Sequence, residues 1–309
     1  MTVSELNENF GLPGVLLFEE HGELTRARIT LPTCDATVYL QGAHLAHWQP
    51  TGQEPVLFLS EHSAFTPGKA IRGGVPICFP WFGGRTDGGP GPSHGFARTT
   101  PWEVAFAALL PDTGEGDRLQ LTFVLAASEL SESLGFSGFR VAYELSIGRT
   151  LTMRLTVANF GEGPFHFEDA LHAYFQVGDV RHASITGLES APFLDKRDDN
   201  KAKSAPSAPL QLTQWTDRVF PASSSSPTIL DAANHRRIVL EKQHSATTVV
   251  WNPWSDGAAA LADLGSDEWQ HFLCVEAANA ATDAITLESG QTHTTVLSVS
   301  VQPDNEPAA

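Results

Sequence analysis

Short segments in which apolar and polar residues alternate recur along most of the chain, and they limit the possible folds more than any other feature. This period of two is typical of half-buried β-strands, because successive side chains of a strand point to opposite faces. Turn residues such as Pro13-Gly14 and Glu288-Ser289-Gly290 separate the segments, and no long stretch has the period of a helix. The predicted strands cover residues 15–18, 26–31, 36–40, 118–126, 139–147, 151–159, 238–242, 247–251 and 292–301.

Helices are predicted only at 128–134 and 256–264. Alternating βαβ units would need a helix between most strands, so the sequence predicts an all-β fold, an antiparallel sandwich or barrel. Two polar segments, DKRDDNKAKSAPSAP at 195–209 and PASSSSP at 221–227, are predicted to be surface loops. Neither separates halves of different composition, so we expect one domain over residues 1–309 with these two loop insertions.

Charge and cysteine content exclude several classes of function. The formal net charge of −17 disfavours nucleic acid and anionic membranes as partners, because both select basic surfaces. Cys34, Cys78 and Cys274 lie far apart, so neither a disulfide framework nor a zinc knuckle is expected. The first residues lack the basic and apolar regions of a signal peptide, and no long apolar run occurs, so we expect a cytoplasmic protein.

The segment at 70–98, AIRGGVPICFPWFGGRTDGGPGPSHGFAR, combines many glycines with Arg72, His94 and Arg98. Glycine lets the backbone come close to a ligand, and arginine offers paired donors to carboxylate or phosphate oxygens. An anionic ligand would need such local positive charge on so acidic a protein. The other interpretation is a loop-rich connection between strands with its arginines in solvent.

Two titratable residues lie in apolar surroundings. His172 is framed by Leu171 and by Ala173-Tyr174-Phe175, so it is either a general acid near neutral pH or a core histidine. Glu276 lies within FLCVEAAN, where most neighbours are apolar. Burial of its carboxylate is costly without a partner, so it is either a functional group or half of a structural ion pair.

Metal sites are weaker hypotheses, and neither a metal nor a cofactor is predicted. His44 and His47 are three residues apart on a predicted strand and would face opposite sides. His166, Glu168 and His172 have the parity to share one face, but no further ligand spacing supports a metal there. Several aromatic residues beside turns or charges could stack on sugar rings or pack in the core: Trp48, Trp81, Phe82, Trp215, Trp251 and Trp254.

A series of separated motifs runs from about residue 38 to about residue 300: QGAH, AIRGGVPICFPWFG, HGFAR, LHAYF, VVWNPW and VEAAN. In these motifs and their order the chain resembles the D-hexose-6-phosphate mutarotases, also called glucose-6-phosphate 1-epimerases, which are relatives of galactose mutarotase. The resemblance implies a galactose-mutarotase-like β-supersandwich, which agrees with the strand pattern.

The resemblance also implies an activity. That family interconverts the α and β anomers of aldohexose 6-phosphates, with glucose 6-phosphate the expected substrate here, by acid–base opening and reclosure of the ring without a cofactor. By similarity Glu276 is the base and His172 the acid. The expected substrate-binding residues are Arg72, Ser93, His94, Arg98 and Asp217, with the two arginines serving the phosphate and sugar oxygens. Ser93 stands where many relatives carry an amide, which has a longer reach.

Three alternatives remain open. An aldose 1-epimerase acting on unphosphorylated hexoses would keep the acid and the base but need no phosphate clamp. A non-catalytic carbohydrate-binding or regulatory module could use the same fold and aromatic residues. A glycosidase would pair Glu168 or Asp169 with Glu276. The expected partner is a small-molecule sugar phosphate bound by a monomer, with no nucleic acid or membrane involved.

Overall fold

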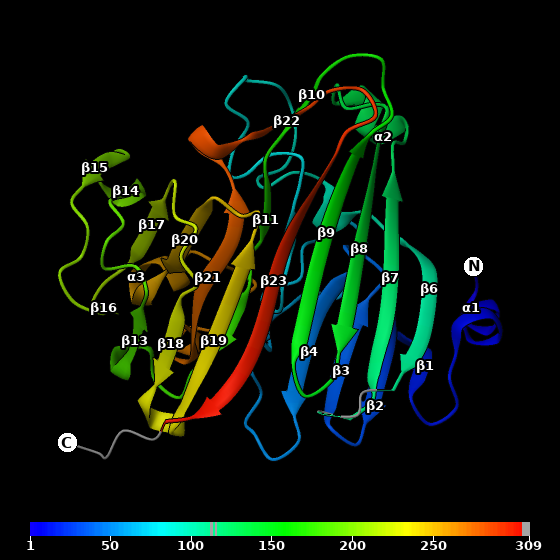
Figure 1. The fold of residues 1–309 in the computed structure, drawn as a ribbon, viewed down its shortest axis with the longest axis horizontal. Coiled ribbons are helices and arrows are strands. Elements are labelled where there is room, and N and C mark those ends of the chain that lie inside the picture. The colour runs from blue at the N-terminus through cyan, green and yellow to red at the C-terminus, as the bar shows by residue number, and fades with distance from the viewer. Residues whose placement is uncertain (112–113, 115, 305–309) are drawn as a thin grey trace.

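The computed structural model describes residues 1–111, 114 and 116–304, and most of its regular structure is strand. Three α-helices occur in these ranges: α1 (Val3–Phe10), α2 (Glu129–Ser133) and α3 (Trp254–Ala258). None of the helices in this part of the chain has the length and apolarity needed to cross a membrane. The strands form two large and two small sheets (Figure 1), so the all-β prediction is confirmed.

The largest sheet has nine strands within the described residues, and all its neighbouring strands run antiparallel. Buried and less buried residues alternate along its longer strands, because one face packs in the core and the other meets solvent. In spatial order the strands are β16 (Leu210–Gln211), β13 (Ala183–Thr186), β18 (Thr228–Asp231), β19 (Arg236–Gln243), β23 (Thr292–Pro303), β9 (Leu151–Asn159), β8 (Phe139–Ile147), β7 (Arg118–Ala126) and β6 (Glu103–Leu110).

A second large sheet has eight strands in the same ranges. Its spatial order is β15 (Lys201–Lys203), β14 (Phe193–Asp195), β17 (Thr216–Phe220), β20 (Thr247–Asn252), β21 (Phe272–Asn279), β11 (Asp169–Leu171) and β5 (Ile77–Cys78). The remaining strand, β12 (Tyr174–Gln176), continues after β11 and also pairs with β21.

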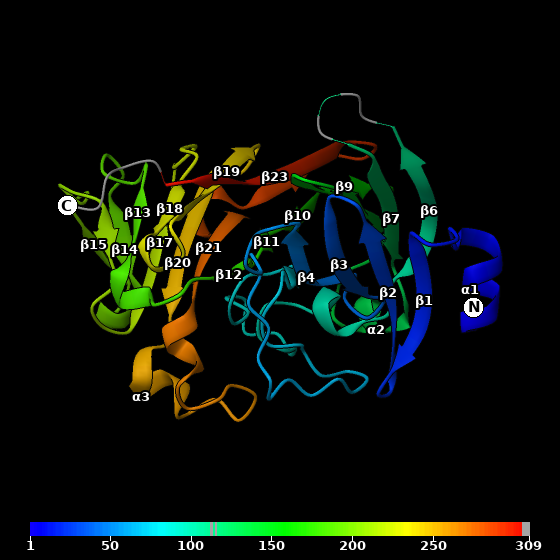
Figure 2. The ribbon, with the colours of Figure 1, turned by 90° about the horizontal axis from the view of Figure 1, so that it is seen from below.

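The small sheets complete the architecture. One has four strands, β1 (Leu16–His21), β2 (Leu24–Leu31), β3 (Cys34–Tyr39) and β4 (His44–Pro50), and the other pairs β10 (Phe165–Phe167) with β22 (Ile285–Leu287). In Figure 2 the nine-stranded sheet forms one layer, and the eight-stranded and four-stranded sheets lie side by side in the other. The main core lies between the layers, where Trp48 of β4 donates its indole N–H to the carbonyl of Gly148 in the opposite layer.

The eight-stranded sheet is covered on both faces. Every residue of β21 is buried, in contrast to the alternation seen in the nine-stranded sheet. The inner face packs on the core, and the segment between β4 and β6 lies on the other side (Figure 2). On the outer face Cys78, Ala170 and Val249 belong to a small separate apolar cluster. A charged side chain on that outer face therefore lies in an enclosed space.

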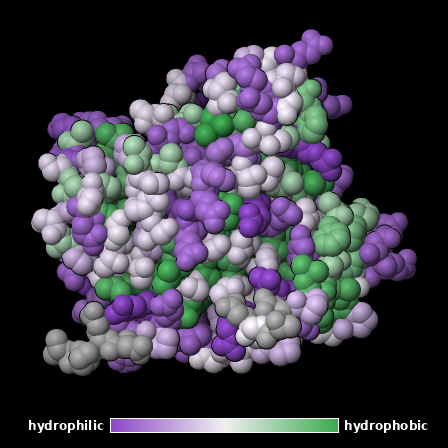
Figure 3. All heavy atoms as spheres, viewed as in Figure 1, coloured by the Kyte–Doolittle hydropathy of each residue, from purple (hydrophilic) through white to green (hydrophobic). Residues whose placement is uncertain are grey.

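The surface on the nine-stranded side is mixed in character. Figure 3 shows polar residues over most of this face, with apolar residues in scattered patches.

The three cysteines are buried free thiols. This agrees with the expectation that they form no disulfide framework.

The predicted strands are confirmed with small shifts at their ends, whereas other segments differ from the predictions. The helix predicted at 256–264 is α3, which begins and ends earlier. Helix α1 was not predicted, although Thr2 and Glu5 form a capping box at its start. The segment at 195–209 is not simply a loop, because β14 and β15 form a hairpin around a 3₁₀ turn at Lys196–Asp198.

Candidate active site

One cavity of about 270 Å³ collects every site residue predicted from the sequence. It lies on the outer face of the eight-stranded sheet, under the glycine-rich segment 70–98. Strands β17, β20 and β21 supply one side of it, and the glycine-rich segment supplies the other. The lining residues are Arg72, Phe82, Ser93, His94, Arg98, His172, Tyr174, Lys196, Asp217, Val249, Trp251 and Glu276.

Strand register brings His172 and Glu276 together, although they lie far apart in the sequence. Strand β11 pairs with β21 up to Leu171 opposite Ala277, and β12 resumes the same register with Tyr174 opposite Cys274. His172 occupies the short interruption between the two ladders, directly across from Glu276. Its Nδ1 lies 3.4 Å from Glu276 Oε1.

The interruption is filled by the glycine-rich segment. The backbone N–H of His172 donates to the carbonyl of Pro76 at 3.0 Å, and that of Tyr174 donates to Gly74 at 2.9 Å. The strand that carries His172 is therefore held by β21 on one side and by the segment that carries Arg72 on the other.

Burial favours the neutral forms of both groups. It raises the pKa of Glu276 well above its usual value, and the nearby carboxylate of Asp217 adds to the rise. It lowers the pKa of His172 well below its usual value, and His94 and Arg98 add to that fall. Neither Glu276 oxygen has a hydrogen-bond partner among the described residues, and neither has Nδ1 of His172. The enclosure therefore disfavours both the carboxylate and the imidazolium.

His94 is held as a neutral hydrogen-bond donor. Burial and the cation of Arg98 lower its pKa to about 3. Its Nδ1 accepts the backbone N–H of Gly83 at 3.2 Å and lies 3.4 Å from the thiol of Cys78. Because Nδ1 is an acceptor, the proton of the neutral ring sits on Nε2.

The backbone that carries His94 is tightly constrained. His94 and Gly95 both have positive φ values, of 65° and 74°. A Cβ on Gly95 would fall onto the carbonyl of Phe79, so only glycine fits at this close approach. Three residues further on, Arg98 turns back and donates through Nη2 to the carbonyl of Ser93 at 2.9 Å.

Arg72 lines the cavity but already has partners. Its Nε and Nη2 donate to the two carboxylate oxygens of Asp263 at 3.2 and 3.1 Å. Its Nη1 donates to the hydroxyl of Tyr174 at 3.0 Å, and the Tyr174 ring stacks on His172 with centroids 4.9 Å apart. The two predicted clamp arginines are thus unlike: Arg72 is neutralised by a carboxylate and supports the wall, whereas Arg98 has no carboxylate partner in the described chain.

Several lining residues were missed from the sequence. Tyr174 was noted only as part of the apolar frame of His172, and Trp251 only as one aromatic among several. Asp263, which does not line the cavity but pairs with Arg72, lay in the segment 256–264 that was predicted as a helix. Lys196 was missed because its surroundings are charged and polar, which is typical of a surface loop. The signal that would have found Lys196 is the pairing of its strand with the strand of Asp217, which brings the two residues close together.

Other predicted clusters do not form. His166 is exposed and bonds the hydroxyl of Thr286, and the carboxylate of Glu168 accepts the backbone N–H groups of Phe82 and Ala281. Asp169 is buried and accepts from Asn279 and Thr295. A glycosidase pair of Glu168 or Asp169 with Glu276 is therefore wrong, because neither carboxylate reaches the cavity. No group of three potential metal ligands occurs in the described ranges.

The cavity contains neither His44 nor His47, and Trp251 is its one tryptophan of those noted in the sequence. His44 is buried beside Gly74, and His47 points to a half-buried surface. Trp48 and Trp81 belong to the main core. Trp215 stacks under the guanidinium of Arg197, and Trp254 packs on Trp269. Of the aromatic residues noted in the sequence, Phe82 and Trp251 line the cavity.

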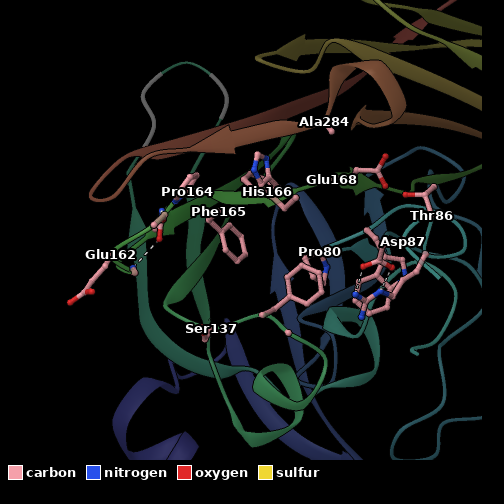
Figure 4. A pocket seen from close by; sticks show the side chains of 18 of the residues that line it. Pro80, Thr86, Asp87, Ser137, Glu162, Pro164, Phe165, His166, Glu168 and Ala284 are labelled. Carbon is pink, nitrogen blue, oxygen red and sulfur yellow. Dashed lines mark hydrogen bonds and ion pairs between the residues drawn. The ribbon is translucent and has the colours of Figure 1, made fainter. Parts of the chain in front are cut away.

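A wider hollow of about 620 Å³ lies on the other side of the glycine-rich segment, around Pro80, Ser137 and His166. Figure 4 shows that Glu162, Asp87 and Glu168 lie apart around it and do not point toward one another. Glu168 and Asp87 are already bonded to the chain. The hollow thus lacks the convergent polar groups of the smaller cavity.

Comparisons with known proteins agree on one family. The sequence profile described as aldose 1-epimerase matches residues 27–300. A protein of Escherichia coli strain K12 named "Putative glucose-6-phosphate 1-epimerase" is 36% identical over 86% of this chain and 87% of its own length. A protein of the same name from Salmonella typhimurium is 35% identical over 88% of this chain and 90% of its own length.

Solved structures show the same relationship. The crystal structure of a "putative mutarotase" from Salmonella typhimurium covers 97% of this chain and 99% of its own, with 32% sequence identity and a TM-score of 0.85. The described fold is therefore that of the galactose-mutarotase-like proteins, as the family resemblance implied, and it agrees with the antiparallel β-fold that the strand pattern predicted.

Proposed function

Because this chain belongs to the aldose 1-epimerase family, we propose that it interconverts the α and β anomers of aldohexose 6-phosphates, with glucose 6-phosphate as its main substrate. The observation that carries the proposal is the contact of His172 with Glu276 inside a cavity that also contains cationic side chains. The reaction is an isomerisation, and an acid and a base suffice for it, so no cofactor is required.

The chemistry explains why the two groups must be neighbours. Both the ring oxygen and the hydroxyl oxygen are bonded to C1 of the sugar. Glu276 removes the proton of the C1 hydroxyl while His172 protonates the ring oxygen, the bond between C1 and the ring oxygen breaks, and an aldehyde forms. After rotation about the C1–C2 bond, the former ring oxygen attacks the other face of the aldehyde, and each group acts in reverse.

One proton is shared by the pair throughout this cycle. Before ring opening the imidazole is protonated and the carboxylate is ionised, and after it the imidazole is neutral and the carboxyl is protonated. Raising the pKa of Glu276 and lowering that of His172 both favour the second form, the one reached on ring opening. The enclosure that makes the charges costly therefore favours the proton transfers that accompany ring opening.

The remaining cavity residues hold the sugar. The carboxylate of Asp217 accepts hydrogen bonds from sugar hydroxyls, and the Nε2–H of His94 donates to a sugar oxygen. Trp251 and Phe82 offer flat apolar surfaces of the kind that pack against a sugar ring. Arg98 and Ser93 lie together at the glycine-rich side, where they serve the phosphate. A single chain supplies all these groups, so we propose a monomer that works in the cytoplasm on a small-molecule sugar phosphate.

Exchange spectroscopy by NMR on glucose 6-phosphate tests the proposal, because it detects interconversion in a mixture whose composition does not change. We expect the protein to accelerate exchange above the uncatalysed rate. Glu276→Gln and His172→Asn should each lose about 10²- to 10⁴-fold of that acceleration, as expected for removal of a general base or acid. Full activity in both variants would refute the mechanism.

Two further measurements separate the alternatives. Equal or better exchange of free glucose and galactose would indicate an aldose 1-epimerase for unphosphorylated sugars. Binding of glucose 6-phosphate without any acceleration of exchange would indicate a carbohydrate-binding module. Retained glucose 6-phosphate binding in Glu276→Gln is the control that the cavity is still folded.

A further inference from the structure

Lys196 is the cavity residue whose role the proposed function leaves open. It follows β14 directly, and the pairing of Leu194 with Val219 and Asp195 with Arg218 places it across from Asp217. Its ammonium lies 5.3 Å from the centre of the Phe82 ring, and a Cβ on Gly83 would be 3.7 Å from it. The side chain thus extends from the β14–β15 hairpin across to the glycine-rich segment.

The hairpin gives this lysine a defined position. The guanidinium of Arg197 stacks on Trp215 with 3.7 Å between its carbon and the ring centre. The carboxylate of Asp195 accepts the backbone N–H of Arg197 at 3.0 Å. The residues on both sides of Lys196 are therefore anchored, whereas the lysine itself is free to follow a ligand at the cavity mouth.

The cations of the cavity differ in what they already bind. Arg72 is paired with Asp263, and Arg98 gives one N–H group to the carbonyl of Ser93. Lys196 has neither a hydrogen bond nor an ion pair with any residue that the structure describes; its contact is with the Phe82 ring. A charge of −17 on the whole chain repels anions at a distance, so a phosphate needs uncompensated cations at its binding site.

We propose that Lys196 binds the phosphate of the sugar together with Arg98, and that it is a main determinant of preference for phosphorylated over free hexoses. This rests on the proposed function of the same site. An ammonium on a flexible stem suits a phosphate, which offers several acceptor oxygens at once. Gly83 has no side chain to cover the Lys196 ammonium, and Ser93 and Arg98 line the same cavity as Lys196.

A different role for Lys196 would be to compensate the carboxylates. Its charge opposes the rise that burial causes in the pKa values of Asp217 and Glu276. If that were its whole role, removing it would change the pH dependence and the rate in the same way for every sugar. Phosphate binding instead predicts a loss that depends on whether the sugar carries a phosphate.

The test compares Lys196→Met with two other variants. Lys201→Met is the matched control, because Lys201 lies on the same hairpin, carries the same charge and pairs with Asp198 at the surface, outside the cavity. Lys196→Arg keeps a cation at the site. We expect Lys196→Met to lower kcat/KM for glucose 6-phosphate at least tenfold more than for free glucose, mainly through KM, as for the loss of one charge-assisted contact. Lys196→Arg should recover most of the difference.

A second readout is independent of catalysis. Titration of the wild-type protein with inorganic phosphate should give saturable binding, and Lys196→Met should raise the Kd about tenfold or more while Lys201→Met leaves it within twofold. Equal losses on both sugars, or an unchanged phosphate Kd, would overturn the role of Lys196. If the wild-type protein exchanges no hexose phosphate, the proposed function fails, and the phosphate titration still decides the question of Lys196.

Discussion

Glu276 combines burial with the absence of a hydrogen-bond partner in the described chain, which is an unusual state for a carboxyl group. A residue of this kind normally lowers stability, so its presence indicates that function outweighs the loss. The neighbouring His172 shares the same enclosure. The burial of these two titratable groups therefore costs stability in a sheet that is otherwise packed with apolar residues.

The raised pKa of the buried Glu276 carboxyl predicts a pH-dependent change in stability for Glu276→Gln. Unfolding returns the carboxyl to its ordinary pKa, so between that value and the raised one the unfolded chain binds fewer protons than the folded chain. The free energy of unfolding of the wild-type protein therefore falls as the pH rises through this window, and glutamine removes that contribution. We expect the variant to gain stability relative to the wild type as the pH rises from the ordinary pKa of a glutamate carboxyl toward the raised pKa of Glu276.

Urea unfolding of both proteins at several pH values measures this difference. Asp217, whose pKa is also raised by burial, is present in both proteins and largely cancels. A stability difference that is the same at every pH would contradict the raised pKa of Glu276.

Sequence patterns predicted the proposed acid and base but not the residues that contact and support them. The apolar residues around His172 and Glu276 drew attention to both. The family resemblance predicted the substrate-binding residues, and all of them line the same cavity: Arg72, Ser93, His94, Arg98 and Asp217. The pairing of Arg72 with Asp263 was not predictable, because it joins segments far apart in the sequence and Asp263 has no unusual local context. The charged and polar neighbours of Lys196 likewise led to the prediction that it lies in a surface loop.

Among the elements, the glycine-rich segment depends most on backbone shape. Gly95 has a φ of 74° and passes directly over the carbonyl of Phe79, between His94 and the turn that carries Arg98. A side chain here would displace both residues from the cavity.

Gly95→Ala is therefore expected to destabilise the protein and impair exchange. The left-handed conformation costs an alanine about 1–2 kcal/mol, and the clash adds about 1–3 kcal/mol. Gly88→Ala is the matched control in the same segment, because Gly88 has a φ of 72° but a Cβ there would meet no described atom within 4 Å. Urea unfolding should show a clearly larger loss for Gly95→Ala, and equal losses would mean that the close approach to Phe79 has no energetic effect.

Elements with strong alternation were predictable and elements with mixed signals were not. Strands β7, β8 and β9 were predicted with their observed bounds, because one face is apolar and the other is not. Strand β21 lacks this alternation since both of its faces are covered, and so it was not predicted as a strand, although its VEAAN motif was noted. The β14–β15 hairpin was hidden by charged residues that lie at the edge of the sheet.

At the scale of the whole molecule, a buried arginine joins parts of both layers. Arg236 of β19 pairs with Asp231 at 3.0 Å and donates to the carbonyls of Glu54, Pro55 and Gln176. It therefore ties the nine-stranded sheet to β12 and to the segment after β4.

We expect Arg236→Met to destabilise the protein by about 3–5 kcal/mol, because it removes the counter-charge of the buried Asp231 carboxylate, which keeps only neutral donors from Gly178 and Asn234, and takes a donor from three carbonyls. Arg237→Met is the control on the neighbouring residue, whose partly exposed ion pair with Asp304 should contribute about 0–1 kcal/mol. Thermal and urea unfolding measure both. A loss below about 1 kcal/mol for Arg236→Met would show that the layers are held together without this contact.

The register that aligns His172 with Glu276 also has a consequence for how such a protein can change over time. The pair is fixed by two ladders that resume in the same alignment, so insertions in the loops between β12 and β21 leave the proposed acid and base where they are. A single inserted residue within β11, before His172, would move the imidazole to the other face of the sheet. The β14–β15 hairpin lies between β12 and β21 at the edge of the sheet, so it can be exchanged without moving the pair. Exchange of this hairpin is expected to change which substituted sugars the site accepts.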